Sequence, residues 1–315
     1  MEVFSITENL LGFYAGRDKC AANGAGTRPA QKDWAQFDLD LGVCAYAFHH
    51  ENRAIVFDTL VSPEHGRLLR AYLEEDAGIR HITVIFSHWH LDHVAGAAAF
   101  QGCPIVASEP TRRMLAHNRA AIEAGSLWGP PPLKPVTLPD TTWLARAPLT
   151  LGDLELELIP WDIHTPGSLA LYSGKGRILL AGDMLEDNIP CLNHPEAAHT
   201  YLIDLKNMAN MDLAAIYPGH GCPEKIKQGG YGQDLIAATD AYIRHVLQLC
   251  RKENDAVMAV DVDASAAPLK DWVAPWQARG TLRYHPVYEG VHQANMQRLR
   301  EYYRDKPLPE VEPIS

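Results

Sequence analysis

The order of apolar and polar positions along the chain predicts short strands interleaved with helices. Residues 82–86 form a continuous apolar run (ITVIF), which is typical of a strand buried on both faces. Between Leu154 and Leu158 apolar and acidic residues alternate strictly, which predicts a strand with one buried and one solvated face. Apolar residues spaced three and four apart between Pro63 and Asp76 predict a helix.

The same patterns predict the remaining elements and the fold class. Further strands are expected at residues 43–48, 53–57, 104–107, 149–159 (two strands), 169–172, 177–181 and 214–217. Further helices are expected at residues 92–101, 109–124, 195–211, 233–252 and 287–303. Hairpin turns such as Gly152-Asp153 are frequent, which favours an α/β fold with two packed sheets and helices outside them over a single parallel sheet.

The chain shows neither an internal repeat nor a low-complexity linker that would divide it. We therefore expect one compact domain over residues 41–254. Residues 1–40, which include the stretch AANGAGTRPA, are expected to form an irregular N-terminal extension. Residues 255–315 are expected to form a C-terminal extension that packs on the domain, with the helix at 287–303 as its main element.

Charge and composition exclude several classes of function. The 315 residues include 28 Lys and Arg against 39 Asp and Glu, which gives a formal net charge of −11. This balance argues against a general nucleic-acid-binding protein, which needs a positive face for the phosphate backbone. No apolar run reaches the ~18 residues of a membrane helix, and the N-terminus lacks a basic leader and a cleavage site. We therefore expect a cytoplasmic protein that acts on a small molecule, without a membrane or nucleic-acid partner, and leave its oligomeric state open.

Potential metal ligands are concentrated in one segment, SHWHLDH at residues 87–93. His88 and His90 lie two apart, so in an extended segment their side chains share one side. Asp92 and His93 follow where the chain must turn into the next helix. Both pairs thus leave the C-terminal end of a buried strand, which is where α/β sheets usually place their sites.

Three later residues extend this set to a predicted pair of metal sites. His164, Asp183 and His220 each follow an apolar strand and are flanked by Gly or Pro. Each is therefore expected to be a loop residue at the rim of a rigid sheet. Five histidines and two carboxylates suit Zn²⁺ or a similar divalent ion, and iron or manganese is also compatible with them.

These residues resemble the ligand motifs of the metallo-β-lactamase superfamily. The likeness rests on H-x-H-x-D-H at residues 88–93, on the three later ligands, and on Phe57-Asp58-Thr59, which is similar to the superfamily's first motif. It covers about residues 40–225. The resemblance implies a four-layer αββα sandwich. The extra length at both ends, which the family's core fold does not require, indicates a specialised substrate pocket.

The resemblance also implies a role for each motif residue. The implied ligands are His88, His90 and His164 for one metal, Asp92, His93 and His220 for a second metal, and Asp183 as the bridge between the two ions. Asp58 would lie outside the ligands and brace the ligand loop.

A metal-dependent hydrolase is the function that this ligand set predicts. Two adjacent cations would lower the pKa of a water between them, and the resulting hydroxide would attack the carbonyl of a small ester-type substrate: a thioester, a lactone or a β-lactam. Asp92 would steer this nucleophile or carry a proton to the leaving group. Trp89 and Trp128 are candidate pocket residues, although a core tryptophan and a proline-rich surface loop are the plainer interpretations of these two positions.

Several alternatives stay open. A nuclease or phosphodiesterase of the same superfamily is disfavoured by the net charge of −11. A mononuclear iron dioxygenase of the persulfide-oxidising type would need fewer ligands, and a purely structural zinc site would need only four. Asp92 alone could be the N-cap of a helix. A glutathione thioesterase would need basic residues near the pocket for the glutathione carboxylates, and Lys206, Lys225 and Lys227 lie near His220 in sequence.

Overall fold

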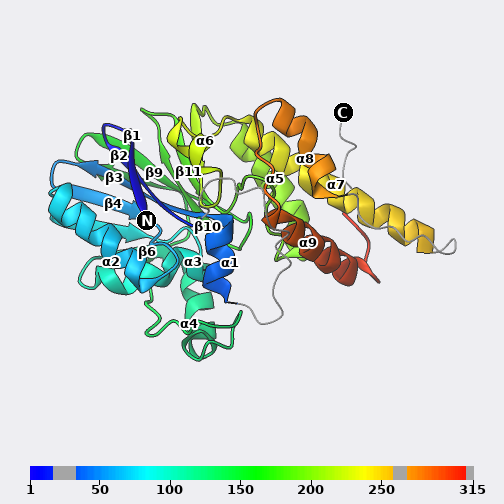
Figure 1. Ribbon diagram of the computed structural model, residues 1–315, viewed down its shortest axis with the longest axis horizontal. Coiled ribbons are helices and arrows are strands. Elements are labelled where there is room, and N and C mark those ends of the chain that lie inside the picture. Colours follow the sequence, from blue (N-terminus) through cyan, green and yellow to red (C-terminus); the bar gives the residue numbers. More distant parts are fainter. Residues whose placement is uncertain (17–32, 258–267, 310–315) are drawn as a thin grey trace.

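Strands of the chain pair into two mixed β-sheets that stack face to face (Figure 1). The computed structural model describes residues 1–16, 33–257 and 268–309, with the backbone alone for residues 252–257. Within these residues one sheet has seven strands in the order β1-β2-β3-β4-β5-β6-β7. The other has five strands in the order β12-β11-β10-β9-β8.

The seven-stranded sheet changes from antiparallel to parallel pairing along its width. Its strands are β1 (Glu2–Thr7), β2 (Leu10–Ala15), β3 (Val43–His50), β4 (Arg53–Phe57), β5 (His81–Ile85), β6 (Ile105–Ser108) and β7 (Thr141–Trp143). Strands β1 to β4 pair antiparallel, whereas β4 to β7 pair in parallel. Because parallel strands end at one edge of a sheet, the segments that follow β4 and β5 meet there.

The five-stranded sheet directs three of its loops to one edge as well. Its strands are β8 (Ala147–Leu151), β9 (Leu154–Trp161), β10 (Ser168–Ser173), β11 (Ile178–Gly182) and β12 (Ala215–Pro218). Strand β10 is antiparallel to both β9 and β11, and β12 is parallel to β11. Strands β9, β11 and β12 therefore run in one direction, and the residues that follow them leave the sheet on the same side.

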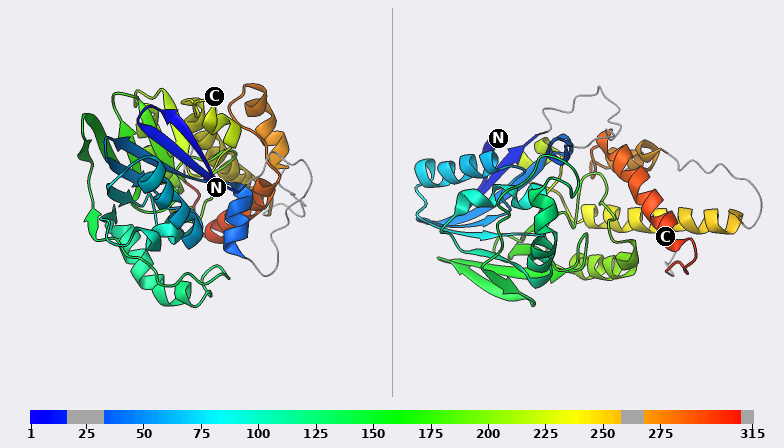
Figure 2. Two further views of the ribbon diagram at one scale, coloured as in Figure 1. Left: turned by 60° about the vertical axis from the view of Figure 1, so that its left-hand side comes forward. Right: turned by 90° about the horizontal axis from the view of Figure 1, so that it is seen from below.

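Helices cover the outside of the two sheets. In the described part of the chain they are α1 (Trp34–Leu41), α2 (Pro63–Ala71), the π-helical turn η1 (Tyr72–Asp76), α3 (Leu91–Val94), the 3₁₀ segment η2 (Ala95–Phe100), α4 (Glu109–Glu123), the 3₁₀ turn η3 (Pro195–Ala197), α5 (Ala198–Ala209), α6 (Pro223–Lys227), α7 (Asp234–Val257), α8 (Leu269–Ala278) and α9 (Val287–Tyr303). Helices α5, α7, α8 and α9 gather at one end of the sheets, whereas α2 lies over the seven-stranded sheet (Figures 1 and 2). The expected α/β architecture with two packed sheets and outer helices is confirmed.

The core has two parts because β3 is buried on both faces. Val43, Ala45 and Ala47 point to the cluster beneath α2, η2 and α4. Tyr46 and Phe48 point the other way, into the cluster between the sheets, which continues under α5, α7 and α9. The predicted alternation of β9 is also confirmed, since its leucines join this inner cluster while its glutamates are more exposed.

The expectation of an irregular N-terminal segment is wrong for the residues that the structure describes there. Strands β1 and β2 form a hairpin, and β2 pairs with β3 from Leu10 to Ala15 along its whole length. In this pairing the backbone N–H and C=O groups of β2 find hydrogen-bond partners in β3. A short apolar run alone does not indicate where such partners lie. The stretch AANGAGTRPA, at residues 21–30, lies outside the described residues. Elements α1, α6, α8 and β7 were also not expected from the pattern.

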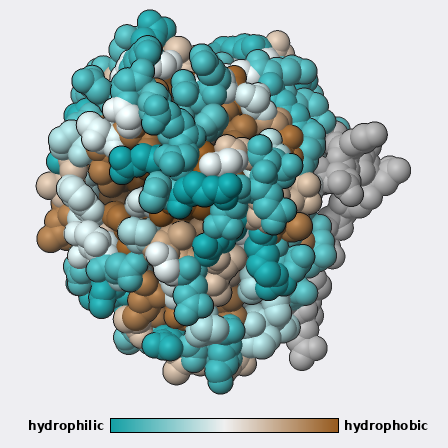
Figure 3. All heavy atoms as spheres, turned by 90° about the vertical axis from the view of Figure 1, so that its left-hand side faces the viewer, coloured by the Kyte–Doolittle hydropathy of each residue, from teal (hydrophilic) through white to brown (hydrophobic). Residues whose placement is uncertain are grey.

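The face of the molecule opposite the C-terminal helices is mostly hydrophilic, with hydrophobic residues in small groups between polar ones (Figure 3). Among the described residues, none of the helices combines the length and the apolar character that crossing a bilayer requires.

Candidate metal centre

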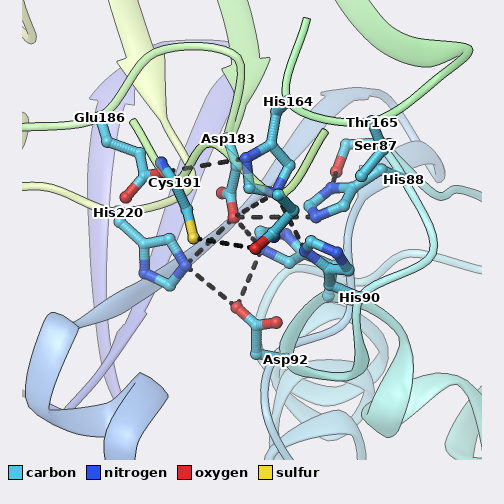
Figure 4. A network of polar contacts seen from close by, with 12 residues as sticks. Ser87, His88, His90, Asp92, His164, Thr165, Asp183, Glu186, Cys191 and His220 are labelled. Carbon is cyan, nitrogen blue, oxygen red and sulfur yellow. Dashed lines mark hydrogen bonds and ion pairs between the residues drawn. The ribbon is translucent and has the colours of Figure 1, made fainter. Parts of the chain in front are cut away.

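The seven side chains expected to hold metal converge at the edge where both sheets end their parallel strands (Figure 4). His88 and His90 follow β5, and Asp92 and His93 lie in α3. His164 follows β9, Asp183 follows β11, and His220 follows β12. His90 rather than Asp92 is the residue that precedes α3, so the N-cap interpretation of Asp92 is wrong.

One group of ligand atoms comes from His88, His90, His164 and Asp183, and these atoms all lie within 4.8 Å of one another. Nε2 of His164 is 2.9 Å from Nδ1 of His90. Oδ2 of Asp183 is 3.7 Å from Nε2 of both His88 and His164. Three imidazoles and one carboxylate oxygen thus face a common centre.

A second group comes from Asp92, His93, Asp183 and His220, again with all ligand atoms within 4.8 Å. Nε2 of His93 lies 3.0 Å from Oδ2 of Asp92 and 3.1 Å from Oδ2 of Asp183. Nε2 of His220 lies 3.1 Å and 3.3 Å from the same two oxygens. Asp183 belongs to both groups, so the two centres share one carboxylate.

Neighbouring groups orient the rings toward these centres. Nδ1 of His93 lies 2.8 Å from Oδ2 of Asp58, and the other oxygen of Asp58 accepts a hydrogen bond from the backbone N–H of Ser87 at 2.7 Å. Nδ1 of His220 lies 2.8 Å from the carbonyl oxygen of Gly42. Nδ1 of His88 lies 2.9 Å from Oγ of Ser87. Because one nitrogen of each ring is engaged in this way, Nε2 is the nitrogen that faces the ligand centre.

The backbone around the centre is locally strained and closely packed. Asp58 and His164 have φ angles of 67° and 70°, in the left-handed region that residues other than glycine rarely adopt. Gly219 lies against the shared carboxylate, since a Cβ at this position would stand 2.3 Å from Oδ1 of Asp183. Strained residues of this kind persist where the surrounding structure holds them, and they are concentrated at functional sites.

Burial keeps the first group of histidines neutral. It lowers the pKa of His88 and His90 well below the ordinary value, and the pKa of His164 to about 4. Neighbouring imidazoles lower these pKa values further. At neutral pH the three rings therefore have lone pairs available for a metal ion.

The second group pairs charges of opposite sign. Burial opposes charge on His93, but Asp183, Asp92 and Asp58 outweigh it and hold the pKa of His93 well above its ordinary range. His93 and His220 in turn hold the pKa of Asp92 and Asp183 well below theirs, against the effect of burial. In the absence of a cation, protons on the two histidines thus supply the positive charge that the carboxylates require.

A divalent metal ion fits these residues. Nε2 of His88 and Oδ1 of Asp183 are buried at the centre and have no hydrogen-bond partner in the described chain. Buried polar atoms are normally paired, so two such atoms within one cluster indicate a missing binding partner. Imidazole nitrogens mixed with carboxylate oxygens are the donor set that zinc and similar divalent ions accept.

The sequence matches the metallo-β-lactamase superfamily over residues 40–220, which is more than half of the chain. The chain belongs to this superfamily. Similar solved structures include a metallo-β-lactamase from Pontibacter korlensis (18% identity, TM-score 0.57, 77% of this chain and 98% of that chain covered) and the metallo-β-lactamase FIM-1 from Pseudomonas aeruginosa in its mono-zinc form (14%, 0.56, 78% and 95%). At such identities the likeness shows the fold. A comparison with curated proteins found no match.

In this member of the superfamily a cavity of about 150 Å³ opens over the two centres, and five of the seven candidate ligands line it. Trp128 lines it as well, as the sequence suggested. Trp89 does not line the cavity, and its ring packs against that of Trp128 with the ring centroids 4.8 Å apart. The plainer interpretation of Trp89 as a core residue is therefore the better one, since it is 7% exposed.

Other residues of the cavity wall were not found from the sequence. They are Trp34, Phe37, Asp38 and Leu41 of α1, Glu186, Cys191 and Asn193 of the loop after β11, and Val291 and Arg298 of α9. Burial and the neighbouring Asp92 raise the pKa of Asp38 well above its ordinary value. Burial, with a contribution from Asp183, raises the pKa of Glu186 to about 8. No motif spacing connects these positions to the ligands, and only their place in the fold identifies them.

Proposed function

We propose that the protein is a dinuclear zinc hydrolase that cleaves the carbonyl bond of a small thioester, lactone or β-lactam. The observation that carries the proposal is the pair of ligand groups, each with its donor atoms within 4.8 Å of one another and joined by Asp183. A purely structural zinc site needs four ligands and leaves no open position. Here seven side chains that could bind metal surround two centres beneath an open cavity.

Each centre has its own residues. His88, His90 and His164 would hold one ion, Asp92, His93 and His220 the other, and Asp183 would contact both. Two zinc ions at these positions would supply a nucleophilic water of lowered pKa and an electrophile for the carbonyl oxygen.

The protein itself contributes orientation and proton exchange. Asp58 and the carbonyl of Gly42 hold the rings of His93 and His220, so that the second centre keeps its geometry during the reaction. Asp92 lines the cavity, and its carboxylate lies beside His93 and His220. We assign to Asp92 the orientation of the attacking group and the proton exchange with the leaving group.

The alternatives have weaker support. A mononuclear iron dioxygenase needs only one of the two centres, whereas all four residues of the second group are buried, as are three of the four in the first. A nuclease would have to attract a phosphate backbone to a chain of net charge −11. The similar structures are metallo-β-lactamases by name, and this supports a carbonyl-cleaving function without selecting its substrate.

The test is a hydrolysis screen on protein of known metal content. Metal-free protein, prepared with a chelator and shown to be folded by circular dichroism, is reconstituted with zinc, iron or manganese. It is then assayed with thioesters, lactones and β-lactams. We expect roughly two zinc ions per chain and hydrolysis in at least one substrate class that is lost with the metal and restored by zinc.

Two results would contradict the proposal. One is a single iron per chain together with oxygen consumption on a persulfide substrate. The other is full hydrolytic activity of the folded, metal-free protein. Salt-sensitive binding and cleavage of RNA or DNA, in the absence of ester hydrolysis, would instead support a nuclease.

A further inference from the structure

The wall of the cavity carries one permanently charged cation among the described residues, Arg298 of α9. The side chain is half-buried, and its Nη1 lies 3.9 Å from Sγ of Cys191. No carboxylate of the described chain forms an ion pair with this guanidinium. Since a guanidinium presents five N–H donors, most of them remain available to a ligand in the cavity.

The basic residues that are close to His220 in sequence do not line the cavity. Nζ of Lys225 donates a hydrogen bond to the carbonyl oxygen of Thr281 at 2.8 Å. Nζ of Lys227 pairs with Oε2 of Glu2 at 2.5 Å. Neither lysine, nor Lys206, lines the cavity. Any anionic group of a substrate would therefore meet Arg298 rather than these lysines.

The cavity also has an aromatic wall that is fixed in position. Trp34 and Phe37 of α1 line it together with Trp128. Nε1 of Trp34 donates a hydrogen bond to the carbonyl oxygen of Pro131 at 2.9 Å, which ties α1 to the loop that carries Trp128. Rigid aromatic side chains bind apolar groups at low entropic cost. Apolar surface and a single cation thus border the ligand centres within one small space.

The charge of the loaded site is compatible with an anionic substrate. Four carboxylates line the cavity, from Asp38, Asp92, Asp183 and Glu186. The positive charge of two divalent ions and of Arg298 equals the negative charge of these four groups and a bound hydroxide when all are ionised. An anionic substrate would therefore meet no net repulsion in the site, and Arg298 would be the positive side chain available to it.

We infer that Arg298 is a specificity-determining residue that binds a carboxylate of the substrate while an apolar part of the same substrate packs against Trp34 and Trp128. The inference rests on the proposed function, because it names the substrate class of that same cavity. It places substrate selection in the C-terminal extension, outside the region that carries the metal ligands. A planar guanidinium suits a carboxylate because it can donate two parallel N–H bonds.

The kinetic test compares matched thioesters. S-phenylacetyl 3-mercaptopropionate and its N-methylamide share the same scissile bond and differ in one remote charge. A second pair places a carboxylate or its amide on the acyl side. Wild-type protein is compared with Arg298→Gln, with the conservative Arg298→Lys, and with Arg300→Gln, which removes an exposed cation of the same helix.

We expect wild-type protein to prefer the carboxylate member of at least one pair. In Arg298→Gln the KM for that substrate should rise about 10- to 100-fold, with little change in kcat or in hydrolysis of the amide. Arg298→Lys should restore part of the preference, and Arg300→Gln should behave as wild type. A merely structural role of Arg298 at Cys191 would impair both members of a pair equally, and this result would overturn the inference.

A binding measurement separates this inference from the proposed function. Quenching of tryptophan fluorescence is titrated with 4-phenylbutyrate and 4-phenylbutyramide on metal-loaded protein. We expect Arg298→Gln to raise the Kd of the carboxylate about tenfold and leave that of the amide unchanged. Equal Kd values for the carboxylate in both proteins would refute the role of Arg298, whether or not the thioesters are hydrolysed. Failure of all hydrolysis with this binding difference intact would refute the proposed function alone.

Discussion

Oδ2 of Asp58 lies 2.8 Å from Nδ1 of His93, and both side chains are buried. Asp58 follows β4 and His93 lies in α3, so the contact joins two segments that leave the same edge of the seven-stranded sheet. The contact directs Nε2 of His93 to the shared carboxylate of Asp183 at 3.1 Å. Asp58 belongs to neither ligand group, and it nevertheless orients a histidine of the second group.

Replacing Asp58 should weaken metal binding at the second centre while the protein stays folded. We expect Asp58→Asn to lower the affinity for the second metal ion by about 10- to 100-fold, because the amide holds the His93 ring less firmly and makes it a weaker base. Isothermal titration calorimetry of zinc into metal-free protein measures both sites. Asp153→Asn, which alters a more exposed His–Asp contact at His50, is the matched control. Unchanged affinity at both centres would show that Asp58 is purely structural.

The shared position of Asp183 predicts a larger loss of metal when Asp183 is replaced than when a histidine of a single group is replaced. His164→Ala should reduce binding at the first centre, and His220→Ala should reduce it at the second. Asp183→Asn should weaken both, since its carboxylate oxygens belong to the two groups. Elemental analysis after gel filtration measures the metal retained. Equal loss of one ion in all three variants would contradict a bridging role for Asp183.

Gly219 should be required for the centre rather than for the fold. In Gly219→Ala the new Cβ would meet Oδ1 of Asp183 at 2.3 Å and Cε1 of His93 at 2.7 Å, and these ligands would have to move. We expect a clear loss of metal affinity with less effect on the unfolding midpoint. Gly174→Ala is the control, because its Cβ would have no neighbour closer than 3.9 Å. Metal binding by Gly219→Ala that equals that of the control would contradict the close packing described here.

Glu186 should make the stability of the metal-free protein depend on pH. Burial raises its pKa to about 8 from an ordinary value of 4.5. Its stabilising contribution is therefore fully present below pH 4.5 and decreases as the pH rises toward 8, because the unfolded chain releases the proton first. Glu186→Gln keeps the neutral form at every pH. As the pH rises from 5 to 8, we expect the free energy of unfolding of the variant to increase by about 1–3 kcal/mol relative to that of wild type.

Urea unfolding of both proteins in the presence of a chelator measures this difference. Glu155→Gln, an exposed change outside the cavity, should show no comparable pH-dependent gain. A constant difference in free energy of unfolding between wild type and Glu186→Gln from pH 5 to pH 8 would show that Glu186 does not titrate in this range.

Much of the sequence prediction is confirmed because it depended on local periodicity. The alternation at Leu154 to Leu158, the buried run at 82–86 and the hairpin turn at Gly152-Asp153 all appear as expected. The N-terminal strands were missed. Strand β2 is buried along its whole length, and its pairing with β3 identifies it as a strand.

By itself the sequence determined which segments follow the buried strands and which residue types those segments offer to a metal ion. It could do so because a histidine or aspartate after a buried strand is a local feature. The tertiary structure decided what stands over those ligands. Asp38 of α1 and Arg298 of α9 reach the same cavity from positions far apart along the chain. The physical reason is that the packing of apolar helix faces brings such side chains together. The residues of an apolar face do not specify which distant segment of the chain will pack against them.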